Sequence, residues 1–244
     1  MIEAIEEVVA RLRRARSVCV LTGSGISAES GLPTFRGVGG LWRTHRVEQL
    51  ASPEGFANDP ILVWSWYNER RAAHGRAEPS AAHRALAGLE SRFPDFTLAT
   101  QNVDSLHLRA GSRNVVELHG NLREARCNGC AATYSLADGM PLERIVHECG
   151  GRFRPQVVWF GEALPQREWG LAAEAAQRAD VMLVVGTSAL VHPAASLATH
   201  YARTAWIVEI NPEQTAISDA VDLAIQARAS EVLPDVERRL GEAR

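Results

Sequence analysis

The sequence contains no lysine, and all 26 of its basic residues are arginines. Biased codon usage is the simplest explanation of this composition, and the absence of lysine alone identifies no function. The arginines also give no basic excess, since the formal net charge at pH 7 is −3. A protein that binds nucleic acid normally carries a basic face, so we expect no nucleic-acid partner.

Long apolar segments are absent as well. No stretch approaches the roughly 18 consecutive apolar residues of a membrane-spanning helix, and the segment MIEAIEEVVARLRRARS at the start of the chain lacks the apolar core of a signal peptide. Cysteine is scarce, and Cys127 and Cys130 form the one CxxC pair. Such a pair is typical of a metal or redox site in a reducing compartment. We therefore expect a cytoplasmic protein with no membrane partner.

The sequence also lacks the GxGxxG pattern of common dinucleotide-binding folds. Gly23 and Gly25 follow the apolar segment 17–21, but the next glycine is Gly31. A strand that ends in a glycine-rich turn still indicates a phosphate site, because glycine lets backbone N–H groups come close to a phosphate. A simple tight turn is the alternative. The pattern argues against an ordinary NAD-dependent dehydrogenase.

The sequence does contain apolar strands that alternate with amphipathic helices. Periodicity predicts helices over 2–15, 60–74, 81–92 and 171–179, and strands over 17–21, 96–100, 115–118, 181–185 and 205–210. Strands that alternate with helices indicate a parallel sheet covered on both faces, so we expect an α/β fold. Residues 122–154 show weak periodicity and several glycines, which indicates a small inserted module.

Polar segments stand at the ends of four of these predicted strands. They are TGSG after residue 21, TQNVD from residue 100, GTS after residue 185 and NPE after residue 210. Ligands of open parallel sheets bind at the carboxyl ends of the strands. We therefore expect the four segments to line one crevice.

Six motifs occur in a fixed order along the chain. They are GSGISAESGLPTFRG (23–37), TQNVDSLH (100–107), ELHGNL (117–122), WFGE (159–162), GTS (186–188) and INPE (210–213). In this combination the chain resembles the sirtuins, the NAD-dependent protein-lysine deacylases, from about residue 17 to residue 232. Two positions depart from the common pattern: Ser24 stands where alanine is more frequent, and Thr34 stands where aspartate is frequent.

The resemblance implies a Rossmann-like parallel sheet with an inserted smaller domain. The Rossmann-like NAD-binding domain would comprise residues 1–37, 80–121 and 156–244. A helical module (38–79) and a zinc-ribbon-like module (122–155) would form the small domain. NAD and the acyl-lysine would enter the cleft between the two domains from opposite sides.

The resemblance also implies a set of NAD contacts. They are Gly23, Ser24, Gly25, Ile26 and Glu29 in the phosphate turn and its helix, Arg36 and Trp42 in a loop that closes over NAD, Gln101, Asn102, Val103 and Asp104 at the nicotinamide ribose and carboxamide, Gly186, Thr187 and Ser188 at phosphate and ribose, Asn211, Pro212 and Glu213 at the adenosine ribose, and Ala229 near adenine.

By the same resemblance, His119 and Asn102 are the catalytic residues. A lone histidine is more often structural, but a histidine titrates near neutrality and can act as a general base. The implied reaction begins when the acyl oxygen attacks C1′ of the nicotinamide ribose and nicotinamide leaves. His119 then deprotonates a ribose hydroxyl, and the products are lysine and O-acyl-ADP-ribose.

Tyr67 and Arg70 determine the expected acyl selectivity. Their spacing places both on one face of a predicted helix, where a packing tyrosine and a solvated arginine are the alternative interpretation. In this position YxxR resembles class III sirtuins, which remove succinyl and malonyl groups. A guanidinium can bind the distal carboxylate of such a group with two hydrogen bonds.

The segment 158–161 is the expected binding site for the substrate backbone. Val158, Trp159, Phe160 and Gly161 resemble the segment that pairs with the acylated peptide as an added strand. A core strand is the alternative, and we expect part of this segment to be buried.

The expected metal ligands are Cys127, Cys130 and Cys149. Sirtuins usually supply two CxxC pairs, but position 146, where the fourth cysteine would stand, is Val146. His147 lies beside it and could be the fourth ligand, although the HxC spacing is awkward for a zinc knuckle. A zinc site and a ribbon held by packing alone therefore remain alternatives.

The sequence is thus expected to encode an NAD-dependent protein deacylase that acts as a monomer on acylated-lysine proteins. It would remove acetyl and also succinyl or malonyl groups. The nearest alternative is a protein mono-ADP-ribosyltransferase on the same fold, and a non-catalytic NAD-binding module is a further one. For a deacylase, the lack of lysine would exclude regulation by acylation of its own side chains.

Overall fold

In the computed structural model, which describes residues 1–35 and 46–242, six parallel strands form the main sheet. They are β1 (Ser17–Thr22), β2 (Asp95–Thr100), β3 (Val115–Glu117), β7 (Val181–Val185), β8 (Trp206–Ile210) and β9 (Leu223–Ile225). Their spatial order is β3-β2-β1-β7-β8-β9, so the order reverses between β1 and β7. This is the order of a Rossmann sheet, in which ligands bind at the reversal. The expected α/β fold with a Rossmann-like sheet is confirmed.

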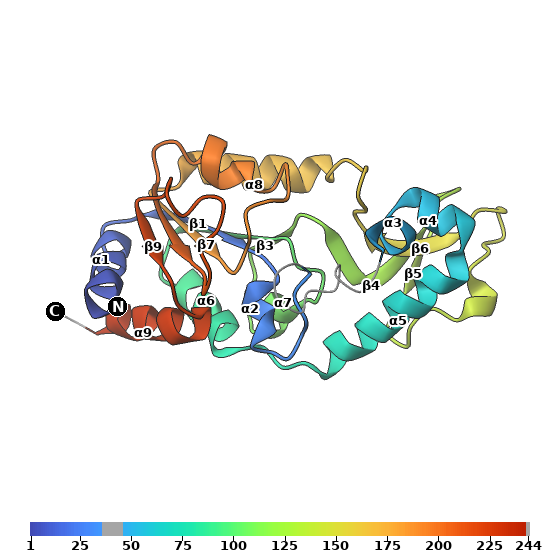
Figure 1. Cartoon of the computed structure of the whole chain (residues 1–244), viewed down its shortest axis with the longest axis horizontal. Coiled ribbons are helices and arrows are strands. Elements are labelled where there is room, and N and C mark those ends of the chain that lie inside the picture. Colours follow the sequence, from blue (N-terminus) through green and yellow to red (C-terminus); the bar gives the residue numbers. More distant parts are fainter. Residues whose placement is uncertain (36–45, 243–244) are drawn as a thin grey trace.

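Side chains of alternate strand residues fill two separate cores. In β7, Val181, Leu183 and Val185 pack with α1 (Ile2–Leu12), α6 (Ala81–Glu90) and α9 (Ala229–Gly241). Met182 and Val184 instead pack with α8 (Gln166–Arg178) and the π-helical turn η3 (Leu197–Tyr201). Figure 1 shows α8 on one side of the sheet and α6 and α9 on the other. Because both faces carry helices, β7 is apolar throughout its length.

A smaller unit lies at the other end of the molecule. Its antiparallel sheet has the order β5-β4-β6 and consists of β4 (Gly120–Cys127), β5 (Thr133–Ser135) and β6 (Phe153–Val157). Its helices are α3 (Val47–Leu50), α4 (Pro53–Asn58), α5 (Pro60–Arg76) and the 3₁₀ turn η2 (Leu142–Arg144). They share one apolar core, in which Trp64 is 1% exposed. We call this unit the small module.

Polar caps fix the starts of the two longer helices in the small module. The Ser52 side chain accepts a hydrogen bond from the backbone N–H of Gly55 at the start of α4, and Asp59 does the same for Leu62 at the start of α5. Each cap is followed by a proline at the first helical position, where the missing N–H costs nothing. These signals fix the residues at which α4 and α5 begin.

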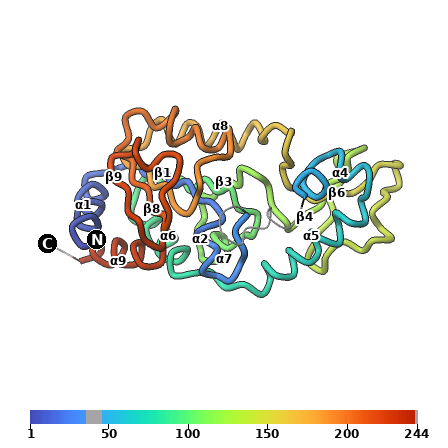
Figure 2. Tube along the Cα trace, viewed as in Figure 1, coloured from blue at the N-terminus to red at the C-terminus, as the bar shows by residue number. Residues whose placement is uncertain are grey.

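The trace in Figure 2 shows how the chain connects the two parts. It leaves the main sheet after β1, returns through α5 and α6, and leaves again through β4 before it returns to α8. Two short helices, α2 (Gly25–Ala28) and α7 (Leu106–Arg109), follow β1 and β2. The N-terminus and the end of α9 lie at the end of the molecule far from the small module.

Several expected boundaries were wrong. The helix expected over 2–15 ends at Leu12, because the N–H groups of Arg14 and Ala15 bond in tight turns that direct the chain into β1. The helix expected over 171–179 begins already at Gln166, after Pro165, and ends at Arg178. The strand expected from residue 205 begins at Trp206. In the described ranges, no helix combines the length and the apolar character that crossing a bilayer demands.

Candidate functional site

A cavity of about 850 Å³ lies between the carboxyl edge of the main sheet and the small module. Its volume falls within the range of about 300–1,000 Å³ that is usual for ligand sites. From the main sheet it is lined by the expected residues Gly23, Ser24, Gly25, Gln101, Asn102, Val103, Gly186, Thr187, Ser188, Asn211, Pro212 and Glu213. From the other side it is lined by Tyr67, Arg70, Val158, Trp159, Phe160 and Gly161, with His119 between the two groups. The four strand-end segments therefore line one cavity.

Glycines bring the loops after β1 and β7 into direct contact beneath this cavity. The N–H of Gly25 donates to the carbonyl of Gly186 over 2.8 Å, and a Cβ on Gly25 would lie 2.7 Å from that oxygen. Gly186 has a φ of +60°, and a Cβ there would lie 2.4 Å from the nitrogen of Ile26. Neither position can carry a side chain, so backbone alone forms this wall, as a dinucleotide pyrophosphate requires.

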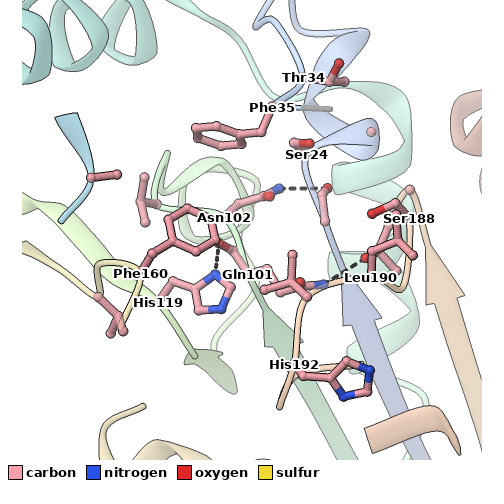
Figure 3. Close-up of a pocket in the computed structure, with 18 of the residues that line it drawn as sticks. Ser24, Thr34, Phe35, Gln101, Asn102, His119, Phe160, Ser188, Leu190 and His192 are labelled. Atoms are coloured by element: carbon pink, nitrogen blue, oxygen red, sulfur yellow. Dashed lines mark hydrogen bonds between the residues drawn. The ribbon is translucent and has the colours of Figure 1, made fainter. Parts of the chain in front are cut away.

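Amide side chains hold the neighbouring loops in register. Asn102 is 5% exposed, and its amide nitrogen donates to the carbonyl of Gly23 over 3.0 Å and to Ser27 Oγ over 3.2 Å. Gln101 donates to Thr187 Oγ1 over 2.9 Å, as Figure 3 shows from the cavity side. Asn211 donates to the carbonyl of Thr187 over 2.9 Å. The loops after four strands thus form one hydrogen-bonded floor.

Asp104 lies one layer behind this floor. Its carboxylate accepts hydrogen bonds from Ser27 Oγ over 2.7 Å and from the backbone N–H of Leu106 over 2.9 Å. It borders a small adjoining cavity that also contains Arg70 and His74. Burial raises the pKa of this carboxyl, and the two hydrogen bonds oppose that shift.

His119 occupies the link between β3 and β4, and therefore between the two sheets. Its Nδ1 lies 3.0 Å from the carbonyl oxygen of Gln101 (Figure 3). Because that oxygen can only accept, Nδ1 carries the proton and Nε2 is left as the basic nitrogen. Burial lowers the pKa of His119, although the hydrogen bond to Gln101 opposes this shift. The arrangement favours a neutral imidazole that can accept a proton at Nε2.

Arg70 and Tyr67 project from the same face of α5 into the cavity. The Arg70 guanidinium lies against two aromatic rings, 4.8 Å from the Phe35 centroid and 4.9 Å from that of Trp66. Burial lowers its pKa to about 10, so it remains charged at neutral pH. Within the described ranges it forms no ion pair with a carboxylate. This cavity wall therefore presents a cation that no carboxylate pairs with directly, although the buried Asp104 carboxyl interacts with it at longer range.

The segment 158–161 leaves β6 and crosses the mouth of the cavity. The N–H of Val158 donates to the carbonyl of His119 over 2.9 Å, and that of Phe160 donates to the carbonyl of Ala51 over 3.0 Å. Trp159 is 2% exposed, whereas Phe160 is 45% exposed. The segment thus alternates between a side chain in the core of the small module and one toward solvent.

A few expected site residues lie elsewhere. Ile26 is fully buried in the core beneath the turn, and Ala229 is buried at the first position of α9. The Glu29 carboxylate accepts from the hydroxyl and the backbone N–H of Ser230, which joins the end of α2 to α9. These three residues are not among the described residues that line the cavity. Arg36 and Trp42 lie outside the described residues.

The cavity wall also includes side chains that the motifs did not single out. They are Phe35, Leu190, His192, Gln214 and Thr215. Phe35 lies within the first motif and the other four follow a motif within a few residues, so position in the loop was the available signal. In the loop after β8, the hydroxyls of Thr215 and Ser218 donate to the buried carboxylate of Glu209, which holds that loop against the sheet.

A separate cluster in the small module has the composition of a metal site. The ligand atoms of Cys127, Cys130, His147 and Cys149 lie within 4.8 Å of one another. Cys127 Sγ is 3.5 Å from Cys149 Sγ, and His147 Nδ1 is 3.2 Å from Cys149 Sγ and 3.4 Å from Cys130 Sγ. Bonds of about 2.3 Å from zinc to sulfur place tetrahedral ligands roughly 3.8 Å apart. The cluster therefore fits zinc.

His147 supplies the fourth ligand atom that the sequence left open. A tight turn from His147 to Gly150, closed by an N–H to carbonyl bond of 2.9 Å, brings its Nδ1 beside Cys149. This turn removes the difficulty of the HxC spacing. Val146 is 64% exposed and takes no part in the cluster.

Comparison with known families gives one match. A model described as the Sir2 family matches residues 23–193 of this chain. The matched region begins at the glycine turn and ends in the loop after β7, so it contains His119, the cysteine cluster and the cavity lining except for the residues after β8.

Named relatives match along nearly the whole chain. The protein of Pyrobaculum aerophilum called NAD-dependent protein deacylase 2 is 51% identical over 238 residues, which cover 94% of each chain. The NAD-dependent protein deacylase of Methylococcus capsulatus is 48% identical over 243 residues, which cover 95% of each chain.

Solved structures agree with these relatives. A Sir2 homologue in complex with NAD has a TM-score of 0.90 at 43% identity, and the match covers 96% of this chain and 93% of that one. A Sir2 complex with a p53 peptide and NAD+ has a TM-score of 0.87 at 32% identity, covering 97% of this chain and 98% of that one.

Proposed function

The chain belongs to the Sir2 family and is an NAD-dependent protein deacylase, and from this premise we propose that it removes succinyl and malonyl groups from lysine, in addition to acetyl groups. The observation that carries this proposal is the charged Arg70 guanidinium in the cavity wall, which forms no ion pair among the described residues and interacts with the buried Asp104 carboxyl only beyond ion-pair distance. Removing a cation from water without an anion is costly. A ligand that brings a carboxylate would compensate that cost.

The surroundings of Arg70 support a carboxylate ligand. The rings of Phe35 and Trp66 lie against the guanidinium, which limits its hydration. His74 Nε2 lies 3.4 Å from Arg70 Nη2, and burial lowers the pKa of His74 to about 3. His74 is therefore neutral and leaves the positive charge to Arg70. A guanidinium held in this way can bind a carboxylate with two parallel hydrogen bonds.

Tyr67 stands one helical turn before Arg70 and lines the same cavity. Burial raises the pKa of its phenol to about 12, so it remains a neutral hydrogen-bond donor at neutral pH. A phenol and a guanidinium together match the oxygen atoms of a distal carboxylate. An acetyl group would leave both donors without an acceptor.

The NAD-facing half of the cavity supports this co-substrate, because Gly25 and Gly186 let the backbones of two loops meet at the expected pyrophosphate site, where any Cβ would push them apart. NAD supplies the ADP-ribosyl group that accepts the acyl oxygen when nicotinamide leaves. In the proposed roles, Asn102 and Gln101 fix the floor against which the nicotinamide ribose is oriented. Orientation of the reacting atoms accounts for a large part of such a rate enhancement.

His119 is the proposed general base. Its Nδ1–H is directed to the Gln101 carbonyl, so the free Nε2 accepts the proton of a ribose hydroxyl. The backbone carbonyl of His119 is held by the N–H of Val158, which fixes the ring beside the substrate-binding segment. Phe160 and Gly161 remain the proposed contacts to the backbone of the acylated peptide.

The acyl proposal is tested with one peptide that is either acetylated or succinylated at the same lysine. The readout is the ratio of kcat/KM for the succinyl peptide to that for the acetyl peptide. We expect Arg70→Met to lower this ratio by about 100-fold, the equivalent of two hydrogen bonds to a charged group.

Arg71→Met is the matched control on the same helix. Its Nη1 donates to the carbonyl of Ala137 in the small module, and it is not among the described residues that line the cavity. We expect this variant to keep the wild-type ratio. The proposal is wrong if the wild-type protein removes acetyl but not succinyl, or if Arg70→Met leaves the ratio unchanged.

A further inference from the structure

Trp159 and Tyr67 are joined by a hydrogen bond between two buried side chains. The indole Nε1 of Trp159 lies 2.9 Å from the phenolic oxygen of Tyr67. Trp159 is 2% exposed and Tyr67 is 4% exposed, so water does not compete for this bond. The two residues lie 92 positions apart, on the segment after β6 and on α5.

The direction of this bond is fixed by chemistry. An indole N–H can only donate, so the phenolic oxygen must be the acceptor. The phenol keeps one O–H of its own, and in the part of the chain that the structure describes no acceptor is within hydrogen-bond distance of it. Because Tyr67 lines the cavity, this O–H is available to a ligand there.

The indole itself has little freedom to move. The Arg154 guanidinium lies 3.6 Å above its ring, and the Phe56 ring lies 5.3 Å away on the core side. Its backbone N–H donates to the Glu162 carboxylate over 2.8 Å, and Glu162 is paired with Arg154. The Nε1–H is therefore aimed at one point, where the Tyr67 oxygen lies.

We propose that Trp159 is a specificity-determining positioning residue, which turns the Tyr67 hydroxyl into a donor aimed at the distal carboxylate of an acidic acyl group. It does so by occupying a lone pair of the phenolic oxygen, so that the O–H rotates toward the cavity. This inference rests on the proposed succinyl and malonyl activity. It differs from the expected role of the segment 158–161, in which the backbone of Trp159 pairs with the peptide.

The test uses Trp159→Phe, Tyr67→Phe and the double variant with the acetyl and succinyl peptides. Each single substitution removes one member of the pair and retains an aromatic ring in the core. We expect each to lower the succinyl-to-acetyl ratio of kcat/KM by about tenfold, since one hydrogen bond to a carboxylate is lost. The double variant should lose no more than Tyr67→Phe alone, because both changes remove the same interaction.

Trp64→Phe is the matched control for the loss of a buried indole. Its Nε1 donates to the carbonyl of Phe153 over 2.9 Å, within the same core, and so makes no hydrogen bond to the Tyr67 oxygen. This variant should keep the wild-type ratio. If Trp64→Phe lowers the succinyl-to-acetyl ratio of kcat/KM as much as Trp159→Phe does, loosening of the core is responsible and the inference is overturned.

The remaining outcomes separate this inference from the proposal on which it rests. If Arg70→Met lowers the ratio but Trp159→Phe does not, the inference fails and the succinyl activity stands. If the effects of Trp159→Phe and Tyr67→Phe add in the double variant, the residues act independently and the inference also fails. If the wild-type protein removes no succinyl group, both fail together.

Discussion

The side-chain amide of Asn102 donates to the backbone carbonyl of Gly23 over 3.0 Å, and so joins the loop after β2 to the glycine turn after β1. The same amide donates to Ser27 Oγ, which in turn donates to Asp104. Ser27 is 2% exposed and links the proposed catalytic amide to a buried carboxylate. The geometry of the reaction centre therefore depends on a side chain that does not line the main cavity.

The first prediction concerns this link. Ser27→Ala removes a donor from a buried carboxylate and an acceptor from Asn102, and each loss costs about 1–3 kcal/mol. We expect kcat/KM for an acetylated peptide to fall about tenfold and the unfolding temperature to decrease. Ser30→Ala is the control, because the Ser30 hydroxyl is buried without a hydrogen-bond partner among the described residues. Steady-state kinetics that show equal effects of the two substitutions would refute the link.

The second prediction concerns the pH dependence of His119. Burial lowers its pKa below the ordinary value of 6.5, and only the neutral imidazole can accept a proton. Lowering the pKa extends the neutral form to more acidic pH, so the acidic limb of kcat/KM should lie below pH 6.5. A pH–rate profile measures its position. The control is His200→Gln, a change at an exposed histidine that should leave the acidic limb of kcat/KM at the same pH. An acidic limb above pH 6.5 would contradict the assignment of His119 as the general base.

The third prediction concerns the contact between two glycines. A methyl group on Gly25 would lie 2.7 Å from the carbonyl oxygen of Gly186 and force the loops apart. We therefore expect Gly25→Ala to weaken NAD binding at least about tenfold, as measured by calorimetry. Gly75→Ala, at a helical position with open space around it, should instead raise the free energy of unfolding by about 0.5–1 kcal/mol. Unchanged NAD affinity in Gly25→Ala would exclude close backbone approach as the requirement.

The fourth prediction concerns metal content. Elemental analysis of the purified protein should find zinc, and His147→Ala should lose it and unfold at lower temperature, because structural zinc contributes to folding. Cys19→Ala should retain the metal, since Cys19 is fully buried in β1 and belongs to the core beside α8. Equal zinc content in wild type and His147→Ala would remove His147 from the ligand set.

The main sheet could be predicted because its strands are buried on both faces. Such strands are short and wholly apolar, as in 181–185, and each ends in a polar motif that the fold places at one edge. The C-terminal pair of β9 and α9 was not predicted. β9 has only three residues, and Pro234 inside α9 argues against a helix, although Val232, Leu233 and Val236 are buried there.

The candidate site was predictable where function depends on a local motif, and less so where it depends on distant partners. The turn at 23–25 and the segment 101–103 lie together at the cavity as expected, whereas Asp104 lies behind them. The Trp159–Tyr67 bond joins residues 92 positions apart and leaves no local signal. The role of His147 in the metal cluster depends on a turn geometry that spacing alone made improbable.

His119 lies in the link between the two sheets. The residues proposed to select the acyl group lie on one side of this link, and those proposed to bind NAD lie on the other. Tyr67, Arg70 and Trp159 belong to the small module, whereas the glycine turn and Asn102 belong to the main sheet. On the proposed assignment, choice of acyl group therefore depends on the small module and use of NAD on the main sheet, and His119 lies in the link between them. An exchange of the small module between relatives, by recombination or by design, would carry acyl preference with it and leave the NAD half unchanged. If the proposed assignment holds, acyl preference can be transferred together with the small module, and His119 is the residue that both proteins in such an exchange would need.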